Sequence, residues 1–177
     1  MITDHVVRHR VRLLALAVLT ATLALILCAP KAGAQASGIK VGAQAPAAIV
    51  ETLDGKQADL AQFVGKQPTL IEFWATWCSN CKELEPAMHA AAAKYKGKVA
   101  FVGVAVSVNQ SPERVRLYAE KHKLPLTVFY DRKGYASDAY DVAATSYIVV
   151  VNKAGKVVYT GLGGDQDIDA AIRKALQ

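Results

Sequence analysis

Short apolar runs of strand length recur along the chain, and segments with a helical pattern separate them. Residues 69–74 predict a buried strand, and residues 99–106 form a continuous β-branched apolar run typical of a strand buried on both faces. Three further runs, at 127–130, 147–151 and 156–160, predict the remaining core strands. The pattern therefore favours a central sheet rather than an all-helical core.

Two helices are predicted between these strands. Residues 78–96 contain strong helix formers, and Pro86 inside them should kink the helix because proline removes a backbone hydrogen bond. Residues 112–123 follow Ser111, which is suited to be the N-cap, and they begin with proline at the first helical position. Each predicted helix follows a strand, which is typical of α/β proteins.

The two ends of the strand-and-helix region complete the predicted architecture. Residues 47–51 and 57–58 flank an Asp-Gly turn and predict a short hairpin, followed by a helical turn at 60–64. Residues 167–176 predict a closing helix with Asp165 as its N-cap. We therefore expect an α/β sandwich on a mixed sheet.

The first 36 residues have the composition of an export segment. Three arginines precede residue 13, residues 13–29 are apolar and uncharged, and residues 34–36 read Ala-Gln-Ala, a suitable cleavage site. The apolar run is long for a cleaved signal and at the short limit for a membrane helix. A cleaved signal and a retained membrane anchor both stay open, with lipidation at Cys28 as a third alternative.

Either main alternative places residues 37–177 outside the cytoplasm, in the periplasm or at the outer face of the inner membrane. These residues have the size of one compact domain. They carry 17 basic and 14 acidic residues, so half of the chain's net charge of +6 belongs to the first 36 residues. Since no basic stripe with interleaved aromatic residues remains, nucleic acid is excluded as an expected partner. We expect a monomer.

Cys78 and Cys81 form a Cys-x-x-Cys pair between the strand at 69–74 and the helix that follows it. At the first turn of a helix, free backbone N–H groups and the helix dipole stabilise a thiolate on Cys78. Cys81 is one turn further along, close enough to form a disulfide with it. The pattern predicts a redox-active dithiol in which Cys78 attacks and Cys81 resolves.

Other uses of these cysteines fit the sequence less well. Zinc would need two more ligands, but the only other cysteine is Cys28 and His89 lies about 12 Å along the helix from Cys81. His122, among charged residues, is interpreted as solvated helix surface. A purely structural disulfide would close a very short loop and stabilise little. We therefore expect no bound metal and no cofactor.

The chain resembles the extracytoplasmic thioredoxin-like proteins of the TlpA/ResA group over essentially all of residues 39–177. The resemblance rests on motifs in the same order and spacing: Val41-Gly42, Ala45-Pro46, Asp54-Gly55-Lys56, Leu60, Gly65-Lys66, Phe73-Trp74-Ala75-Thr76-Trp77-Cys78, Cys81-Lys82, Pro86, Val102-Gly103-Val104, Tyr140-Asp141-Val142 and Gly155-Lys156-Val157. It implies a thioredoxin fold with an added N-terminal β-hairpin.

The same resemblance implies an activity and partners. It implies thiol–disulfide exchange with other envelope proteins, some of them apocytochromes awaiting haem, and a membrane thiol transporter as electron source. The intervening pair Ser79-Asn80 lacks the proline common in the group, so the direction of electron flow stays open.

Three further residues are candidates for roles at the dithiol. Glu72 interrupts an apolar strand and, by the resemblance, occupies the place of a buried carboxylate beneath Cys81 that relays its proton. Burial without a cation would raise the pKa of Glu72 toward that of a general base. An edge position or a pair with a lysine is the alternative. Trp77, beside Cys78, is a candidate for client docking, whereas Trp74 is expected in the core.

Ser146 stands where the group usually has a cis-proline that faces the dithiol. We expect a trans peptide before Ser146, because a cis bond to a non-proline residue costs about 2.5–4 kcal/mol. Its hydroxyl and N–H would then be available to hydrogen-bond a client or the Cys78 thiolate. We expect Ser146→Pro to change client turnover and to reduce any metal uptake at the reduced thiols, without disturbing the fold.

Two related activities are weighed against this hypothesis. A peroxiredoxin-like peroxidase would need threonine and proline where this chain has Ala75 and Ile71, and an arginine near the thiolate. A thioredoxin-like copper chaperone would need three residues between the cysteines and a histidine before the late strand, but no histidine follows His122.

Overall fold

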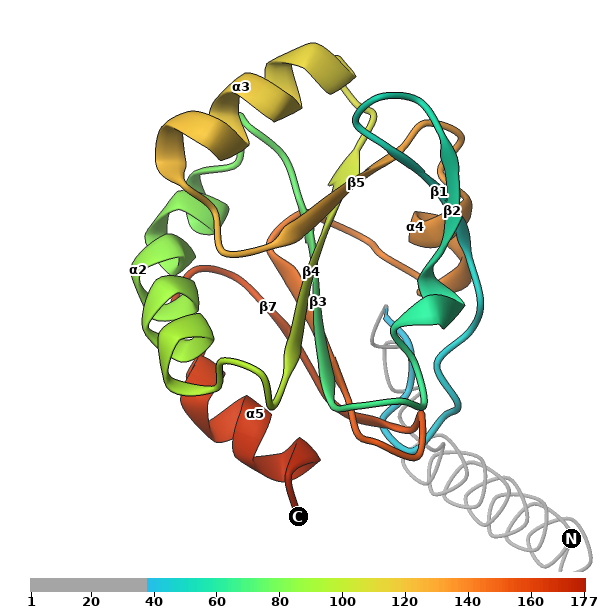
Figure 1. Ribbon diagram of the computed structural model, residues 1–177, viewed down its shortest axis with the longest axis vertical. Helices are drawn as coiled ribbons and strands as arrows, with labels where there is room; N and C mark the ends of the chain where they lie inside the picture. Colours follow the sequence, from blue (N-terminus) through green and yellow to red (C-terminus); the bar gives the residue numbers. More distant parts are fainter. Residues whose placement is uncertain (1–37) are drawn as a thin grey trace, which may run out of the picture. The chain divides into compact units, whose positions relative to one another are not determined.

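The strands join into one mixed sheet of seven strands. The computed structural model describes residues 38–177, and the labels are those of Figure 1. The strands are β1 (Ile49–Thr52), β2 (Gln57–Asp59), β3 (Thr69–Trp74), β4 (Ala100–Val106), β5 (Thr127–Asp131), β6 (Tyr147–Val151) and β7 (Val157–Leu162). The helices are α2 (Ser79–Lys94), α3 (Pro112–His122), α4 (Tyr135–Ala139) and α5 (Ile168–Ala175), with a short 3-10 helix, η1 (Leu60–Gln62).

The strand order is β2-β1-β5-β4-β3-β6-β7. β3, β4 and β5 run parallel, and their crossovers contain α2 and α3. β6 pairs antiparallel with β3 and with β7. β1 pairs antiparallel with β5 and with β2, and β1 and β2 form a hairpin at one edge of the sheet. The expected thioredoxin fold with an added N-terminal hairpin is confirmed.

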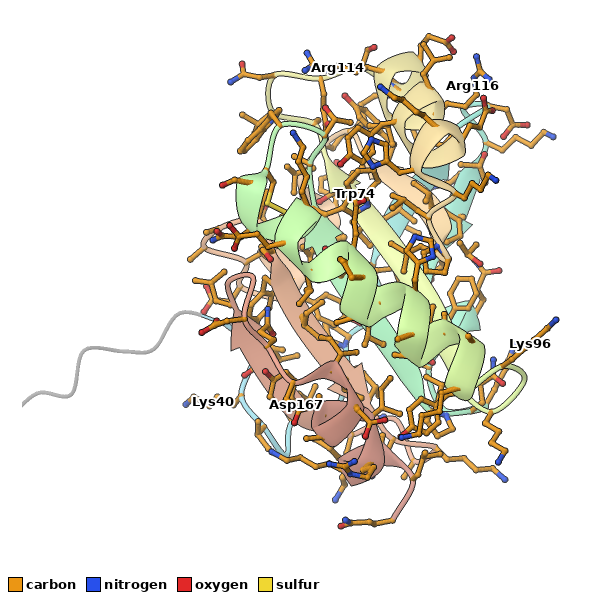
Figure 2. All side chains as sticks on the ribbon, turned by 90° about the vertical axis from the view of Figure 1, so that its left-hand side faces the viewer. Lys40, Trp74, Lys96, Arg114, Arg116 and Asp167 are labelled. Atoms are coloured by element: carbon orange, nitrogen blue, oxygen red, sulfur yellow. A yellow bond between two sulfur atoms is a disulfide. The ribbon has the colours of Figure 1, made fainter. Side chains whose placement is uncertain are left out.

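Helices cover both faces of the sheet (Figure 1). On β3, Leu70 and Trp74 pack with residues of α2, α3 and α5, whereas Ile71 and Phe73 pack with η1 and α4. This alternation follows from the two-residue period of a strand. It also directs Glu72 to the face that α2 covers, the same face as the dithiol, and Figure 2 shows α2 lying across that face in front of Trp74.

Most predicted elements are present, with two differences. The five-residue helix α4 was not predicted; it is too short for a periodic pattern and begins after Gly134, whose φ of 75° favours glycine. The N-cap of α5 is Asp167, whose side chain accepts from the Ala170 N–H, so the prediction of Asp165 was wrong. The predicted helix around Pro86 is present as α2, which continues through the proline to Lys94. The kink at Pro86 stays a prediction.

The predicted export segment lies outside the described residues. Within residues 38–177, no helix has both the length and the apolar character needed to span a bilayer.

Candidate active site

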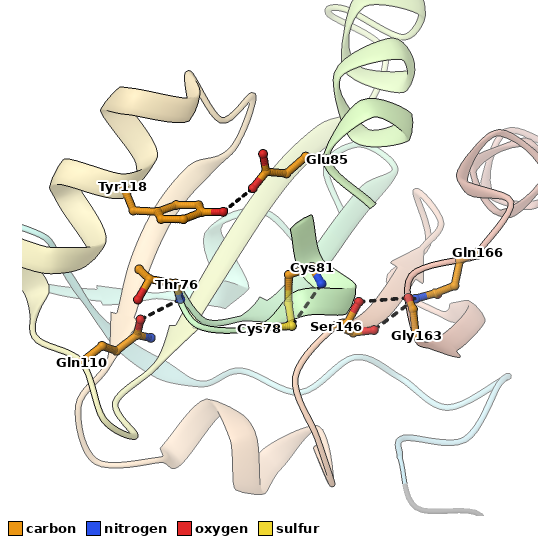
Figure 3. Close-up of a disulfide and its surroundings, with 9 residues drawn as sticks. All are labelled: Thr76, Cys78, Cys81, Glu85, Gln110, Tyr118, Ser146, Gly163 and Gln166. Carbon is orange, nitrogen blue, oxygen red and sulfur yellow. Dashed lines mark hydrogen bonds between the residues drawn. A yellow bond between two sulfur atoms is a disulfide. The ribbon is translucent and has the colours of Figure 1, made fainter. Parts of the chain in front are cut away.

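Cys78 and Cys81 form a disulfide at the start of α2, with their Cα atoms 5.3 Å apart. Cys78 is the N-cap rather than the first helical residue, and its Sγ accepts a hydrogen bond from the Cys81 N–H at 3.1 Å (Figure 3). Both cysteines are only 5% exposed. The N-cap position directs backbone N–H groups at Cys78 Sγ, which stabilises negative charge there after reduction.

The loop before Cys78 is hydrogen-bonded to the loop between β4 and α3. The Thr76 N–H donates to Gln110 Oε1 at 2.9 Å, and Gln110 Nε2 donates back to the Val106 carbonyl. Trp77 Nε1 donates to the Val108 carbonyl at 2.8 Å. These contacts fix the entry to the dithiol from a segment more than 30 residues away in sequence. No motif marks Gln110, so the sequence could not have identified it.

Trp77 is exposed beside Cys78, as its candidate role in docking requires, with 43% of its surface accessible. It borders a shallow apolar groove of about 250 Å³ that Val106, Val108, Ser137 and residues 142–145 also line. Trp74, in contrast, is buried at 2% exposure, as expected. The two tryptophans thus contribute to different parts of the structure.

Glu72 is buried on β3, with 5% of its surface accessible. Burial, and in second place the negative charge of Glu85, raise the pKa of Glu72 from 4.5 to about 8. Its strand neighbours are Gly103 on β4 and Ile148 on β6, so an edge position is excluded. No ion pair of the described residues includes Glu72. The raised pKa places this carboxyl in the working range of a general base.

His122 does not lie on a purely solvated surface, and this prediction was wrong. Its Nδ1 is 2.9 Å from Glu85 Oε2, and its ring stacks on Tyr118 with centroids 3.9 Å apart. Tyr118 donates its hydroxyl to Glu85 Oε1 at 2.6 Å (Figure 3). Helical periodicity places Tyr118 and His122 on one face of α3, but it does not indicate that Glu85 of α2 meets them.

Ser146 lies on the opposite side of the dithiol from Gln110 (Figure 3). None of the described peptide bonds is cis, so the bond before Ser146 is trans, as expected. Ser146 is fully buried, however, and its hydroxyl donates to the Gly163 carbonyl at 2.9 Å, while its carbonyl accepts from Gln166 Nε2 at 3.1 Å. The hydroxyl is therefore engaged within the protein.

The backbone conformation at Ser146 is one that proline cannot adopt. Its φ of 64° lies in the left-handed region, whereas a proline ring holds φ near −65°. Ser146→Pro thus cannot keep this backbone conformation, so the substitution requires a local rearrangement of the loop before β6; that the variant keeps the overall fold stays a prediction.

The described residues contain no group of three or more histidine, cysteine, aspartate or glutamate side chains arranged to hold a metal ion. What the site does contain is a disulfide at a helix N-terminus, a carboxyl with a raised pKa beneath the same helix, and an apolar groove beside the first cysteine. This arrangement is suited to the transfer of two electrons between sulfur pairs.

Comparison with known proteins agrees with this chemistry. Residues 40–176 match the Redoxin family. The thioredoxin-like protein YneN of Bacillus subtilis is 37% identical over 63% of this chain and 66% of its own. The thiol-disulfide oxidoreductase ResA of the same organism is 32% identical over 68% of this chain and 66% of its own. The chain thus spans about two thirds of the length of these curated relatives.

A solved structure has the same fold as this chain. The crystal structure of a secreted disulfide oxidoreductase of Mycobacterium tuberculosis, described as homologous to E. coli DsbE, superimposes with a TM-score of 0.61 and 24% identity. The match covers 73% of this chain and 95% of that one. With its Cys78–Cys81 pair, this chain belongs to the Redoxin family, as a thiol-disulfide oxidoreductase similar to ResA.

Proposed function

We propose that this protein acts outside the cytoplasm and exchanges its Cys78–Cys81 pair with the cysteine pairs of other extracytoplasmic proteins. The observation that carries the proposal is the position of the pair, at the N-terminus of α2 beside the exposed Trp77. A sulfur at a helix N-cap next to an exposed apolar surface is suited to attack a disulfide in a bound polypeptide.

Cys78 is the proposed nucleophile. As a thiolate it attacks one sulfur of a client disulfide; a Cys78–client bond forms, and the other client sulfur leaves with the electron pair. The N-cap position and the Cys81 N–H, which already points at Cys78 Sγ, support this role. Cys81, one turn into the helix, then attacks Cys78 and releases the reduced client.

Glu72 is the proposed acceptor of the proton that Cys81 loses in this second step. Its burial on the face that carries Trp74 and α2, together with a pKa of about 8, supports the role. A base of this pKa is partly ionised at neutral pH and can take up a proton without a large energetic cost.

The groove beside Trp77 is the proposed docking surface for the client chain. Its apolar lining, which includes Trp77 next to Cys78 in the sequence, fits an extended polypeptide with an apolar side chain close to its cysteine. Because the Ser146 hydroxyl bonds to Gly163, we assign client contacts on this side to residues 142–145 and keep Ser146 as the residue that supports them.

The predicted export segment supports the proposed location, and the resemblance to the TlpA/ResA group supports the proposed partners. The predicted export segment at 1–36 supports an extracytoplasmic location, by secretion or by a retained anchor. A pair that is oxidised in each cycle needs a source of electrons, and a membrane thiol transporter is the proposed one. Apocytochromes are proposed among the clients because the resemblance to the TlpA/ResA group implies them.

Trapping of client proteins tests this function. In Cys81→Ser, a client attached to Cys78 cannot be released, so disulfide-linked complexes should accumulate in the extracytoplasmic fraction and disappear on reduction. The matched control Cys78→Ser should accumulate far fewer. Equal trapping by both variants, or consumption of peroxide by the wild type without any trapped protein, would contradict the proposal.

A further inference from the structure

Glu72 is surrounded by groups that cannot neutralise its charge. Its neighbours on the adjacent strands, Gly103 and Ile148, carry no charge. The buried Nε1 of Trp74, two residues further along β3, has no hydrogen-bond partner. It packs closely over Gly103, where an added Cβ would lie 2.9 Å from that nitrogen. Two titratable groups on the helices above the sheet interact electrostatically with Glu72, namely Glu85 of α2 and Tyr118 of α3. His122 of α3 contacts both of these side chains.

Glu85 is held in one orientation by α3. One carboxylate oxygen accepts from the Tyr118 hydroxyl at 2.6 Å, and the other lies 2.9 Å from His122 Nδ1. Tyr118 is itself fixed between the His122 ring, at 3.9 Å, and the Trp74 ring, at 5.6 Å between centroids. The side chains of Glu85 and His122 are only 21% and 28% exposed. This carboxylate is therefore much less free to move than one on a solvated helix surface.

The position of Glu85 gives its charge an influence on the reaction. It lies one helical turn after Cys81, on the side of α2 that meets α3. Its negative charge is the second cause, after burial, of the raised pKa of Glu72. Burial and the same carboxylate also raise the pKa of Tyr118, so the phenol keeps its proton and remains a donor to Glu85.

We propose that Glu85, fixed by Tyr118 and His122, is a positioning residue of the exchange reaction: its charge determines how readily Glu72 accepts the proton of Cys81. The inference rests on the proposed function and deepens it. Among the described residues, the hydrogen bonds of the Glu85 side chain are to Tyr118 and His122, not to Cys78 or Cys81. Glu85 acts on the reaction through Glu72 alone and so sets the pH range in which Cys81 resolves a mixed disulfide.

Resolution of the mixed disulfide moves one proton and replaces one sulfur–sulfur bond with another. The Cys81 thiol gives its proton to the Glu72 carboxylate, and its sulfur attacks Cys78. The Cys78–Cys81 bond forms while the Cys78–client bond breaks, and the client sulfur leaves with the electron pair. The pair is oxidised and the client is reduced. A carboxylate at Glu85 disfavours the ionised form of Glu72 and so delays this step to higher pH.

The test is the pH profile of resolution in Glu85→Gln, which removes the charge but keeps an amide oxygen for Tyr118. Reduced protein is mixed rapidly with a fluorescent peptide disulfide, and the release of the second peptide thiol is followed from pH 6 to 9. We expect the midpoint of the profile to fall below that of the wild type and the rate at pH 7 to rise roughly threefold. Glu83→Gln, on the exposed side of the same helix, should leave the profile unchanged.

A second measurement does not depend on activity. In oxidised protein with 13C-labelled glutamate carboxyls, the Glu72 signal, assigned by its loss in Glu72→Gln, should titrate at lower pH in Glu85→Gln. An unmoved Glu72 midpoint overturns the inference, even if the variant exchanges disulfides normally. A shifted midpoint with an unchanged resolution profile overturns the catalytic part. Absence of exchange in the wild type overturns the proposed function instead.

Discussion

At the scale of single residues, the site combines two side chains whose surroundings have opposite effects on charge. Cys78 is at a helix N-cap, where backbone N–H groups stabilise a thiolate. Glu72 is enclosed by apolar neighbours and a like charge, which disfavour its carboxylate. One group is thus prepared to be an anion and the other to accept a proton.

The raised pKa of Glu72 predicts a specific dependence of stability on pH. Because the folded protein holds this proton up to about pH 8 and the unfolded chain only to about 4.5, the free energy of unfolding should fall by about 1.4 kcal/mol per pH unit between these values. Glu72→Gln removes this dependence. Denaturant titration of the oxidised proteins should show the variant gaining on the order of 4 kcal/mol relative to wild type between pH 5 and 8.

A parallel pH dependence of the two proteins would contradict the assignment of a buried, uncompensated carboxyl at Glu72. Glu83→Gln serves as the control, because that side chain is exposed and should follow the wild type.

The order of reactivity of the two thiols is a second prediction at this scale. Cys78 is the N-cap of α2, and its Sγ accepts a hydrogen bond from the Cys81 N–H, whereas Cys81 lies inside the helix. Brief alkylation of the reduced protein near neutral pH, followed by peptide mapping, should therefore label Cys78 first. Faster labelling of Cys81 would reverse the proposed roles of nucleophile and resolving thiol.

At the scale of elements, the dithiol is held by loops distant in sequence. Gln110 and Val108, from the loop after β4, fix Thr76 and Trp77, while Ser146 bonds to Gly163 on the other side. The local sequence pattern predicts individual helices and strands. It does not predict these loop contacts, because they form only when the folded sheet places distant segments of the chain side by side.

Ser146 provides a prediction for the loop before β6. Proline cannot adopt its φ of 64°, and the substitution also removes the hydroxyl bond to Gly163. We expect Ser146→Pro to lower the free energy of unfolding by roughly 1–3 kcal/mol. Ser146→Gly is the matched variant: it loses the same hydroxyl but accepts this φ, so it should be less destabilised in thermal or denaturant unfolding. Equal stability of Ser146→Pro and wild type would contradict the backbone described here.

The limits of sequence-based prediction follow from the same contrast. β3 and β6 were predicted with their observed bounds because buried strands carry a continuous apolar signal. The dithiol and Glu72 were identified because a motif and a charge in an apolar run are local features. Glu85 and His122 were not connected, because their contact arises only where α2 and α3 cross the same face of the sheet.

At the scale of the whole molecule, a domain with its redox-active cysteine pair at the start of α2 is joined to a segment predicted to direct export. The three arginines before residue 13 favour a cytoplasmic start and an extracytoplasmic domain. A reporter enzyme fused after Gln177 should therefore be active only outside the cytoplasm. N-terminal sequencing should begin at Ser37 if the segment is cleaved, or at the original start if it is retained.

Activity of that reporter in the cytoplasm would contradict the proposed location but not the chemistry of the dithiol. The two parts of the account can therefore fail separately.

The central claim is that Cys78 and Cys81 together carry two electrons to or from another protein's cysteine pair. The most direct measurement mixes the reduced protein with a peptide that contains one disulfide and determines both products by mass spectrometry. The account predicts one reduced peptide and one Cys78–Cys81 disulfide for each protein molecule, a stable mixed disulfide in Cys81→Ser, and no reaction in Cys78→Ser. Unchanged peptide with the wild type, or full reduction of the peptide by Cys78→Ser, would contradict it.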